Sequence, residues 1–289
     1  MQAEPSGGPP VGSTRSRLFR GLKQEGAKGV AIAVVSTVVV LVVIVVVVTN
    51  SPYWPEFKDF FFNRQIFLDS LPGILAKFRR NIFYFCVAEV FVLAFALLLA
   101  VMRSLRGPVF FPIRAMSIIY TDVFRGVPTI LVVLLLGFGM PTLAIPGLPT
   151  SPTFWAIVAL ILGYSAYVSE VYRAGIESVH PTQVGAARSL GLSRLQSLRH
   201  VVIPQAVRRV IPPLMNDFVA LQKDTALVAF VVAVPEAFKQ SQIDKAATFN
   251  ATPYVAVSLV FLIVTIPCTR LTDYLVERER RRRQASAGV

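Results

Sequence analysis

The chain has 289 residues, of which 54% are hydrophobic and only 16% are charged, whereas a soluble domain carries about a quarter charged residues. This composition excludes an ordinary soluble protein and predicts an all-α polytopic membrane protein. The net charge of +13 also occurs in nucleic-acid-binding proteins, but where the charges lie matters more than their total. Cys86 and Cys268 lie in apolar stretches, so we expect them to pack rather than to form a disulfide.

The N-terminal part of the chain combines a polar leader with a first span. Residues 1–29 are rich in Gly, Pro, Ser and basic side chains, a composition typical of a disordered cytoplasmic segment. The uncharged run Val30–Val48 can cross about 30 Å of hydrocarbon as a helix, and lipid favours helix despite the many valines. Residues 50–80 are expected to be an extracytoplasmic loop with interfacial aromatics. Residues 30–80 therefore hold an extra first span and this loop.

Five further apolar segments bring the predicted number of spans to six. They cover about residues 81–102, 115–139, 153–172, 210–234 and 252–271. Twenty Lys and Arg residues lie in segments on one side of the membrane in this arrangement, and seven lie on the other. The positive-inside rule therefore places both termini in the cytoplasm.

The C-terminal segment, residues 276–289, is a basic tail in which four consecutive arginines follow Glu279. Nucleic-acid patches have this composition as well. Its position directly after the last span favours instead a cytoplasmic anchor that holds the helix against anionic lipid. We therefore expect contact with membrane lipid and none with nucleic acid.

A polar, basic stretch, residues 182–204, lies between the fourth and fifth predicted spans on the cytoplasmic side. Its first half is expected to be a short helix that Thr182 caps and that ends in a left-handed conformation at Gly191. This helix contains Ala186 and Ala187, whose small side chains would let another backbone approach closely.

The second half of the stretch predicts another short helix, which Ser193 caps. Leu195 and Leu198 share one face of it, and Pro204 suits the first turn of the helix that follows. Two interpretations are open for the pair of short helices. They form either a docking surface for a cytoplasmic partner or an amphipathic segment that lies on the lipid surface.

Polar and charged side chains within the predicted spans are candidate substrate-pathway residues, because a charge at membrane depth is costly unless it faces a cavity or a partner. Asp122 and Arg125 lie three residues apart, and we expect them to pair along one helix face. Glu89 lies alone in an apolar helix, where it either contacts a cationic substrate or seals a helix interface. The candidates are Glu89, Asp122, Arg125, Asn216, Asp217, Lys223 and Asp224.

The fifth predicted span carries two polar stripes. Asn216 and Lys223 are seven residues apart, as are Asp217 and Asp224, so each pair follows one side of the helix. A helix with two polar stripes does not face lipid on those sides. We expect this span to line the translocation pathway.

Four elements of the basic stretch keep the spacing of a known motif: Ala186-Ala187, Gly191, Val201 and Ile203-Pro204. This spacing resembles the EAA loop of the membrane subunits of bacterial ATP-binding-cassette importers. The glutamate of that motif is replaced by Gly185 here, which removes an ion pair to the ATPase, so the resemblance implies docking by shape. The ATPase-coupling residues that it implies are Ala186, Ala187, Gly191, Leu195, Leu198 and Pro204.

Three further strings resemble elements of the polar-amino-acid branch of these permeases: Tyr120–Thr129, Glu170–Ile176 and Gln222–Val228. Together the match covers about residues 80–275, so we assign the permease core to residues 81–275, including the coupling segment 182–204. The first span and its leader fall outside this match. The resemblance implies a type I ABC importer permease fold with a five-helix core and one extra N-terminal transmembrane helix.

The resemblance also implies that other chains complete the machine. No nucleotide-binding loop of the GxxxxGK[ST] type is present, so ATP and Mg are expected on two cytoplasmic ATPase subunits. No catalytic residue, metal site or cofactor is expected in this chain. The other implied partners are a sister permease or a second copy, and an extracytoplasmic substrate-binding protein. The implied location is the bacterial cell membrane.

Alternatives stay open for the substrate that is carried and for the energy source. The overall likeness to actinobacterial glutamate-uptake permeases favours an acidic amino acid, while basic and neutral polar amino acids stay open. An ion-driven secondary transporter that uses Glu89 or Asp224 is the rival from another class, although such folds often show inverted repeats and none is found here. A scaffold that recruits a cytoplasmic protein without transport is the third reading.

Overall fold

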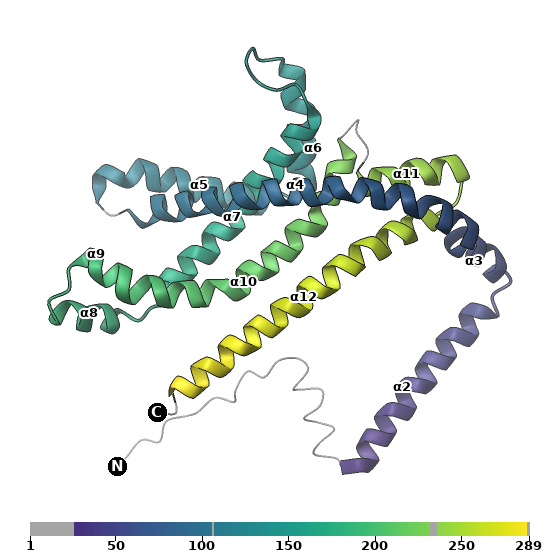
Figure 1. The fold of residues 1–289 in the computed structure, drawn as a ribbon, viewed down its shortest axis with the longest axis horizontal. Helices are drawn as coiled ribbons and strands as arrows, with labels where there is room; N and C mark the ends of the chain where they lie inside the picture. The colour runs from purple at the N-terminus through teal and green to yellow at the C-terminus, as the bar shows by residue number, and fades with distance from the viewer. Residues whose placement is uncertain (1–25, 106, 232–235, 288–289) are drawn as a thin grey trace. The chain divides into compact units, whose positions relative to one another are not determined.

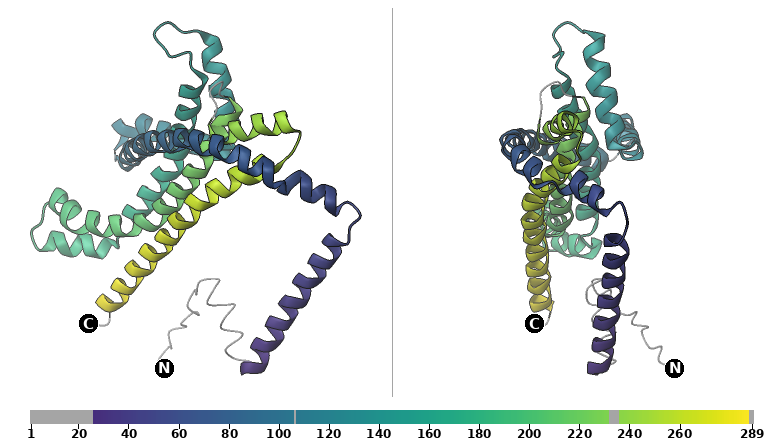
Figure 2. Two further views of the ribbon diagram at one scale, coloured as in Figure 1. Left: turned by 45° about the vertical axis from the view of Figure 1, so that its right-hand side comes forward. Right: turned by 90° about the vertical axis from the view of Figure 1, so that its right-hand side faces the viewer.

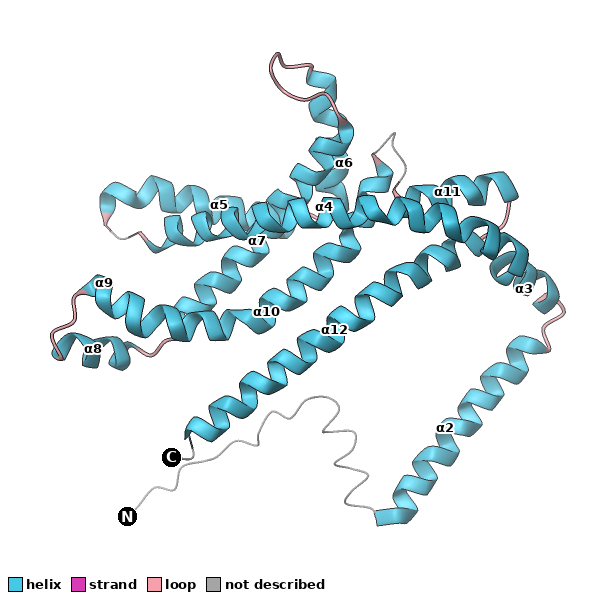
Figure 3. Cartoon of the chain, in the orientation of Figure 1, coloured by secondary structure: helices cyan, strands magenta, loops and turns pink. Residues whose placement is uncertain are grey.

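The computed structural model describes residues 26–105, 107–231 and 236–287. Within these ranges all regular secondary structure is helical, as predicted (Figure 3). Residues 1–25, which make up most of the expected disordered leader, lie outside the described residues. The chain divides into two units, Met1–Asp59 and Phe60–Val289, and each is described by itself.

The first unit contains one long helix, α2 (Gly26–Thr49), which confirms the span predicted over Val30–Val48. Nearly all of its large apolar side chains are exposed, as expected of a helix surrounded by lipid. The hydroxyls of Ser36 and Thr37 donate to the carbonyl of Ala33, at 3.0 and 2.7 Å. The helix therefore satisfies these polar groups internally, as lipid requires.

Residues 50–80 are mostly helical, so the loop expected there is wrong. The helices are α3 (Trp54–Phe62) and the first part of α4 (Arg64–Ser104), separated only by Asn63, whose side chain accepts hydrogen bonds from the first turn of α4. Pro72 lies inside α4 without ending it, because a proline removes one backbone donor and need only bend a packed helix. The second predicted span, 81–102, is the latter part of α4.

The third predicted span, 115–139, is broken rather than continuous. After the short 3-10 turn η1 (Pro108–Phe110), α5 (Phe111–Gly126) and α6 (Thr129–Leu143) meet at an angle of 103°. Val127 is extended, with φ −96° and ψ 131°, because the ring of Pro128 disfavours the helical conformation in the residue before it. The dipeptide Val127-Pro128 therefore turns one predicted helix into two.

The remaining predicted spans are recovered to different degrees. The fourth and sixth, 153–172 and 252–271, lie within α7 (Pro152–Glu177) and α12 (Thr252–Ala287). The fifth, 210–234, begins inside α10 (Ile203–Asp224), which ends ten residues before the predicted end of the span.

That helix, α10 (Ile203–Asp224), continues as the 3-10 turn η3 (Thr225–Phe230), and α11 (Ala237–Thr248) follows. Among the described residues, four helical segments are long and apolar enough to cross a membrane, or five when α5 and α6 count as one broken span. α10 is not one of them, because its charged side chains lower its mean hydropathy. Six spans with both ends in the cytoplasm therefore stay a prediction.

α7 is the centre of the second unit. It packs against α4, α6 and α10, and Leu160, which is fully buried, lies in the core that these helices share with η3. α10 and α12 run side by side, and the short helices α8 (Pro181–Ser189) and α9 (Arg194–Ser197) lie at the shared end of α7 and α10, away from α6 (Figures 1 and 2). Cys268 is half-buried, but Cys86 is exposed, so the packing role expected for Cys86 is wrong within this chain.

Candidate functional site

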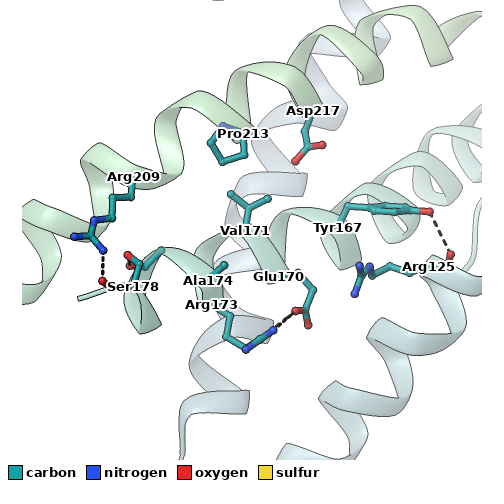
Figure 4. A pocket seen from close by; sticks show the side chains of 11 residues that line it. Arg125, Tyr167, Glu170, Val171, Arg173, Ala174, Ser178, Arg209, Pro213 and Asp217 are labelled. Atoms are coloured by element: carbon teal, nitrogen blue, oxygen red, sulfur yellow. Dashed lines mark hydrogen bonds and ion pairs between the residues drawn. The ribbon is translucent and has the colours of Figure 1, made fainter. Parts of the chain in front are cut away.

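An open cavity of about 480 Å³ lies between the end of α5, the second half of α7 and α10 (Figure 4). Its walls carry three arginines and two carboxylates among apolar and small side chains. The lining residues are Arg125, Tyr167, Glu170, Val171, Arg173, Ala174, Gly175, Ser178, Arg209, Pro213 and Asp217. The cavity therefore presents both signs of charge to whatever enters it.

Asp217 lines this cavity, and two other predicted pathway residues, Glu89 and Asp224, are linked to it by pairwise contacts. The acidic cluster, Glu89, Asp217 and Asp224, brings one carboxylate from α4 together with two from α10. Glu89 interacts electrostatically with Asp217, and Tyr164 of α7 interacts with Asp217 and donates its hydroxyl to Asp224 Oδ2 at 2.8 Å. Asp217 Oδ2 is buried without a hydrogen-bond partner in the structure. A buried carboxylate oxygen without a partner favours a positively charged group beside it.

Arg125 stands at the end of α5 and not in the ion pair that was expected. Within the described residues, Arg125 and Asp122 do not pair, and Asp122 is exposed. The guanidinium of Arg125 lies 5.8 Å from the ring centre of Tyr167, whose hydroxyl donates to the Arg125 carbonyl at 3.3 Å. The contact with α7 thus turns Arg125 towards the cavity, and the predicted pairing is wrong.

Glu170 is a cavity residue that the list of substrate-pathway candidates did not include, although it is a charge within the fourth predicted span. Its carboxylate pairs with Arg103 of α4 and with Arg173, at 2.6 Å for the latter, and Arg173 also pairs with Glu177 at 2.5 Å. Arg209 of α10 donates to the carbonyl of Ser178 at the end of α7. The i,i+3 spacing of Glu170 and Arg173 was visible in the sequence, but their meeting with Arg103 depends on the fold.

The second polar stripe of α10 points elsewhere. Asn216 and Lys223 are both exposed, and Lys223 lines a separate groove of about 460 Å³ between α10, α11 and α12, together with Phe238, Tyr254 and Thr265. The structure therefore brings Glu89, Arg125, Asp217 and Asp224 to one region and leaves Asp122, Asn216 and Lys223 outside it. In the described part of the chain, no three metal-ligating side chains meet.

The coupling segment begins with α8 (Pro181–Ser189). His180 caps this helix by accepting the backbone N–H of Thr182 at 3.3 Å, so the cap predicted at Thr182 is wrong and lies two residues too late. Gly191 ends the helix with φ 87°, and the backbone N–H groups of Gly191 and Leu192 donate to the carbonyls of Arg188 and Ala187 at 3.0 and 3.2 Å. This pair of bonds is a Schellman motif and confirms the predicted left-handed stop.

The second short helix, α9 (Arg194–Ser197), continues as one π-helical turn, η2 (Leu198–Val202). Ser193 and Gln196 cap it reciprocally: Ser193 Oγ accepts the Gln196 N–H at 3.2 Å, and Gln196 Oε1 accepts the Ser193 N–H at 2.8 Å. The predicted cap is therefore confirmed, and Pro204 does lie in the first turn of α10.

The surface of the coupling segment is apolar at its tip. Leu190 and Leu195 are 85% and 74% exposed, and Leu198 is 40% exposed. Ala186 is exposed as well, whereas Ala187 is buried. Large exposed leucines at the end of two helices are typical of a surface that binds another molecule.

Comparison with known proteins gives a consistent picture. The family model described as "Binding-protein-dependent transport system inner membrane component" matches residues 93–281. The probable amino-acid permease protein YxeN of Bacillus subtilis is 32% identical over 219 residues, which cover 74% of this chain and 94% of the relative. The glutamine transport system permease protein GlnP of Escherichia coli is 32% identical over 167 residues, which cover 57% and 74%.

Two solved structures share the fold. The crystal structure of an amino acid ABC transporter with histidines superposes with a TM-score of 0.65 at 29% identity and covers 74% of this chain and 96% of that chain. An inward-facing structure of the MetNI methionine ABC transporter gives a TM-score of 0.57 at 17% identity over 71% and 95%. The second likeness concerns the fold alone.

Proposed function

Because this chain belongs to the family of binding-protein-dependent transport system inner membrane components, we propose that it is the membrane subunit of an ATP-driven importer that translocates a polar amino acid. Permease subunits of this family lie in the cell membrane and are not enzymes themselves. ATP and Mg are held by two cytoplasmic ATPase subunits in this proposal. A sister permease or a second copy and an extracytoplasmic binding protein complete the assembly.

One observation carries the choice of an amino acid. Asp217 lines the same cavity as Arg125, and its buried Oδ2 has no hydrogen-bond partner. An amino acid is a zwitterion, so its carboxylate can bind the guanidinium of Arg125 and its ammonium group can bind the carboxylate of Asp217. Charge-assisted hydrogen bonds of this kind are the strong ones in a site of low dielectric. The acidic cluster therefore binds the ammonium end of the substrate, and Arg125 binds the carboxylate end.

The charge balance of the site bears on which amino acid is carried. Glu89 interacts with Asp217, and Tyr164 interacts with Asp217 and Asp224, whereas Lys223 lines a different groove, from which its charge reaches Asp224. An acidic side chain would add a further negative charge beside the acidic cluster, and like charges at close range are costly. We therefore propose a neutral polar or basic amino acid, in place of the glutamate or aspartate that the sequence likeness favours.

The coupling segment supplies the mechanical link. Its exposed leucines and Ala186 fit a groove of the ATPase, the left-handed stop at Gly191 fixes the angle between the two short helices, and Pro204 starts the helix that leads into the cavity wall. Closure of the ATPases would move this segment as one body and rock α7 and α10 between inward- and outward-facing states.

The experiment is uptake of radiolabelled arginine, glutamine and glutamate by the assembled transporter. Asp217→Asn and Arg125→Gln are each expected to raise the apparent KM about tenfold or more, since each removes a charge-assisted hydrogen bond worth about 1.5–3 kcal/mol. Asp122→Asn is the matched control, because Asp122 is a carboxylate of the same helix as Arg125 that is exposed outside the cavity. Its KM should stay as in the wild type.

Two results would contradict the proposal. Wild-type KM values in both Asp217→Asn and Arg125→Gln would remove the cavity as the substrate site. Uptake that continues without ATP and stops when the ion gradient is dissipated would favour the secondary-transporter alternative.

A further inference from the structure

A buried polar cluster joins three helices far apart in the sequence. Asn81 of α4, Thr225 at the start of η3 and Glu236 before α11 are 1%, 0% and 0% exposed. Asn81 Nδ2 donates to Glu236 Oε2 at 2.7 Å and to Thr225 Oγ1 at 3.3 Å. Asn81 Oδ1 accepts the backbone N–H of Ala237 at 3.0 Å. One amide side chain therefore connects α4, η3 and α11.

Glu236 is at the same time the N-terminal cap of α11. Its Oε2 accepts the backbone N–H of Phe238 at 2.9 Å, and its Oε1 accepts that of Lys239 at 2.5 Å. A carboxylate in this position is stabilised by the helix dipole and by the free N–H groups of the first turn. Apolar side chains, including Ile74 and Phe78, form the core beside it. In such surroundings a satisfied polar network specifies one arrangement of its helices.

Thr225 carries this constraint to the acidic cluster. Its hydroxyl donates to the carbonyl of Gln222 at 2.8 Å, and α10 ends at the residue before it. That last residue of α10 is Asp224, whose Oδ2 accepts the hydroxyl of Tyr164 at 2.8 Å. The place at which α10 ends decides where the Asp224 carboxylate lies.

We propose that Asn81 and Glu236 are positioning residues for the substrate, which hold the end of α10 so that Asp224 stays in the acidic cluster. This inference rests on the proposed function, because it assigns Asp224 to the binding of the substrate's ammonium group. It also ties α11, which lies in a segment expected outside the cytoplasm, to the substrate site. The sequence separations of 144 and 155 residues explain why no local pattern indicated the link.

The test measures KM and maximal rate of uptake for the assembled transporter, with whichever of radiolabelled arginine, glutamine and glutamate it transports fastest. Glu236→Gln keeps the size of the side chain and removes one acceptor. The apparent KM is expected to rise about tenfold or more, because a binding group that is misplaced by about 1 Å loses most of its effect. The amount of assembled complex should stay at the wild-type level.

The second part of the test reverses the direction of the hydrogen bond between Asn81 and Glu236. Asn81→Asp alone places two carboxylates together and should raise KM further. The double variant Asn81→Asp/Glu236→Gln restores a donor and an acceptor in the opposite direction, so its KM should return towards the wild-type value. Ser241→Ala is the matched control: Ser241 is 0% exposed on α11 and donates to the Phe238 carbonyl at 2.7 Å, without a link to Asn81. Its KM should not change.

The outcomes separate the two proposals. If Asp224→Asn raises KM and Glu236→Gln does not, the positioning role is wrong while the substrate site stands. If Asp224→Asn also leaves KM unchanged, the binding role of Asp224 and the positioning role fail together. Should Glu236→Gln not assemble, Thr225→Val, which cuts the link to Asn81 and leaves the cap of α11 intact, must raise KM. A wild-type KM in that variant would overturn the inference.

Discussion

Gly175 of α7 lies directly against Val210 of α10. A Cβ on Gly175 would overlap Cγ1 of Val210 and would lie 3.4 Å from the carbonyl oxygen of Ala206. Gly175 lines the cavity, and Val210 follows the coupling segment by less than two turns of α10. This tight contact of the two helices thus lies between the segment proposed to dock on the ATPase and the cavity proposed to bind substrate.

The first prediction concerns this crossing. Gly175→Ala is expected to destabilise the permease by about 1–3 kcal/mol, the usual effect of an added methyl in a packed contact, and to lower uptake. Val210→Ala in the same chain should restore both, because it removes the atom that the new methyl meets. Thermal unfolding and uptake of the single and double variants measure these effects.

Gly163→Ala is the control for the crossing, since Gly163 is also buried on α7 but has open space at its Cβ position. It should leave uptake unchanged. A double variant no better than Gly175→Ala would show that Val210 is not the partner that matters.

The second prediction concerns the coupling segment. Gly191→Val puts a β-branched side chain at φ 87°, where a left-handed conformation costs about 1–2 kcal/mol. The Schellman motif should open, so that the ATPase no longer co-purifies and uptake is lost while membrane insertion is retained. Gly191→Asn is the milder control, because Asn tolerates this conformation. Normal ATPase association in Gly191→Val would exclude the segment as the docking surface.

Several features of the fold could be read from the sequence because they are local. The run Val30–Val48, the stop at Gly191 and the cap at Ser193 each depend on neighbours within a few residues. The break at Pro128 was also local, but the apolar residues on both sides of it gave a stronger signal for one continuous span. Lipid-exposed and core residues are both apolar, so hydropathy does not tell them apart.

The candidate site was predictable only in part. Asp217 and Asp224 share a stripe of one helix, so the sequence places them together. Asp122 and Arg125 have the spacing of a helical ion pair, but in the fold Arg125 lies over the ring of Tyr167 of α7 instead. Asn81 and Glu236 are 155 residues apart in the sequence and form a hydrogen bond, which no local sequence pattern predicts.

The third prediction concerns pH. Burial raises the pKa of the Glu236 carboxyl above its ordinary value of 4.5, although hydrogen bonds from Phe238, Asn81 and Lys239 oppose the shift. The folded state therefore holds this proton to higher pH than the unfolded state does. The stability that it contributes is present below about pH 4.5 and is lost as the pH rises through the folded pKa.

The melting temperature of the wild type, relative to that of Glu236→Gln, should accordingly fall as the pH rises above about 4.5. Lys239, whose charge acts on Glu236, and Tyr84, on which the charge of Glu236 acts, are the same in both proteins, so the difference isolates one carboxyl. A difference that does not change with pH would contradict the assignment.

The fourth prediction concerns topology. In a chain whose Cys86 and Cys268 are replaced by alanine, single cysteines at Ser13 and Ser286 should react with an impermeant label only after the inner leaflet is opened. A cysteine at Thr150 should react from outside in intact cells. Labelling of either terminus in intact cells would overturn the arrangement with both ends in the cytoplasm.

The length of α12 has a consequence for the end of the chain. Its 36 residues span about 54 Å as a helix, well beyond the hydrocarbon thickness of about 30 Å. A flexible tail could fold back onto the headgroups, but a rigid rod carries its charges outward, so Arg278 and Arg281 would stand at a fixed height above the leaflet. With the C-terminus in the cytoplasm, as predicted, the length of α12 would set how far from the membrane its basic end lies.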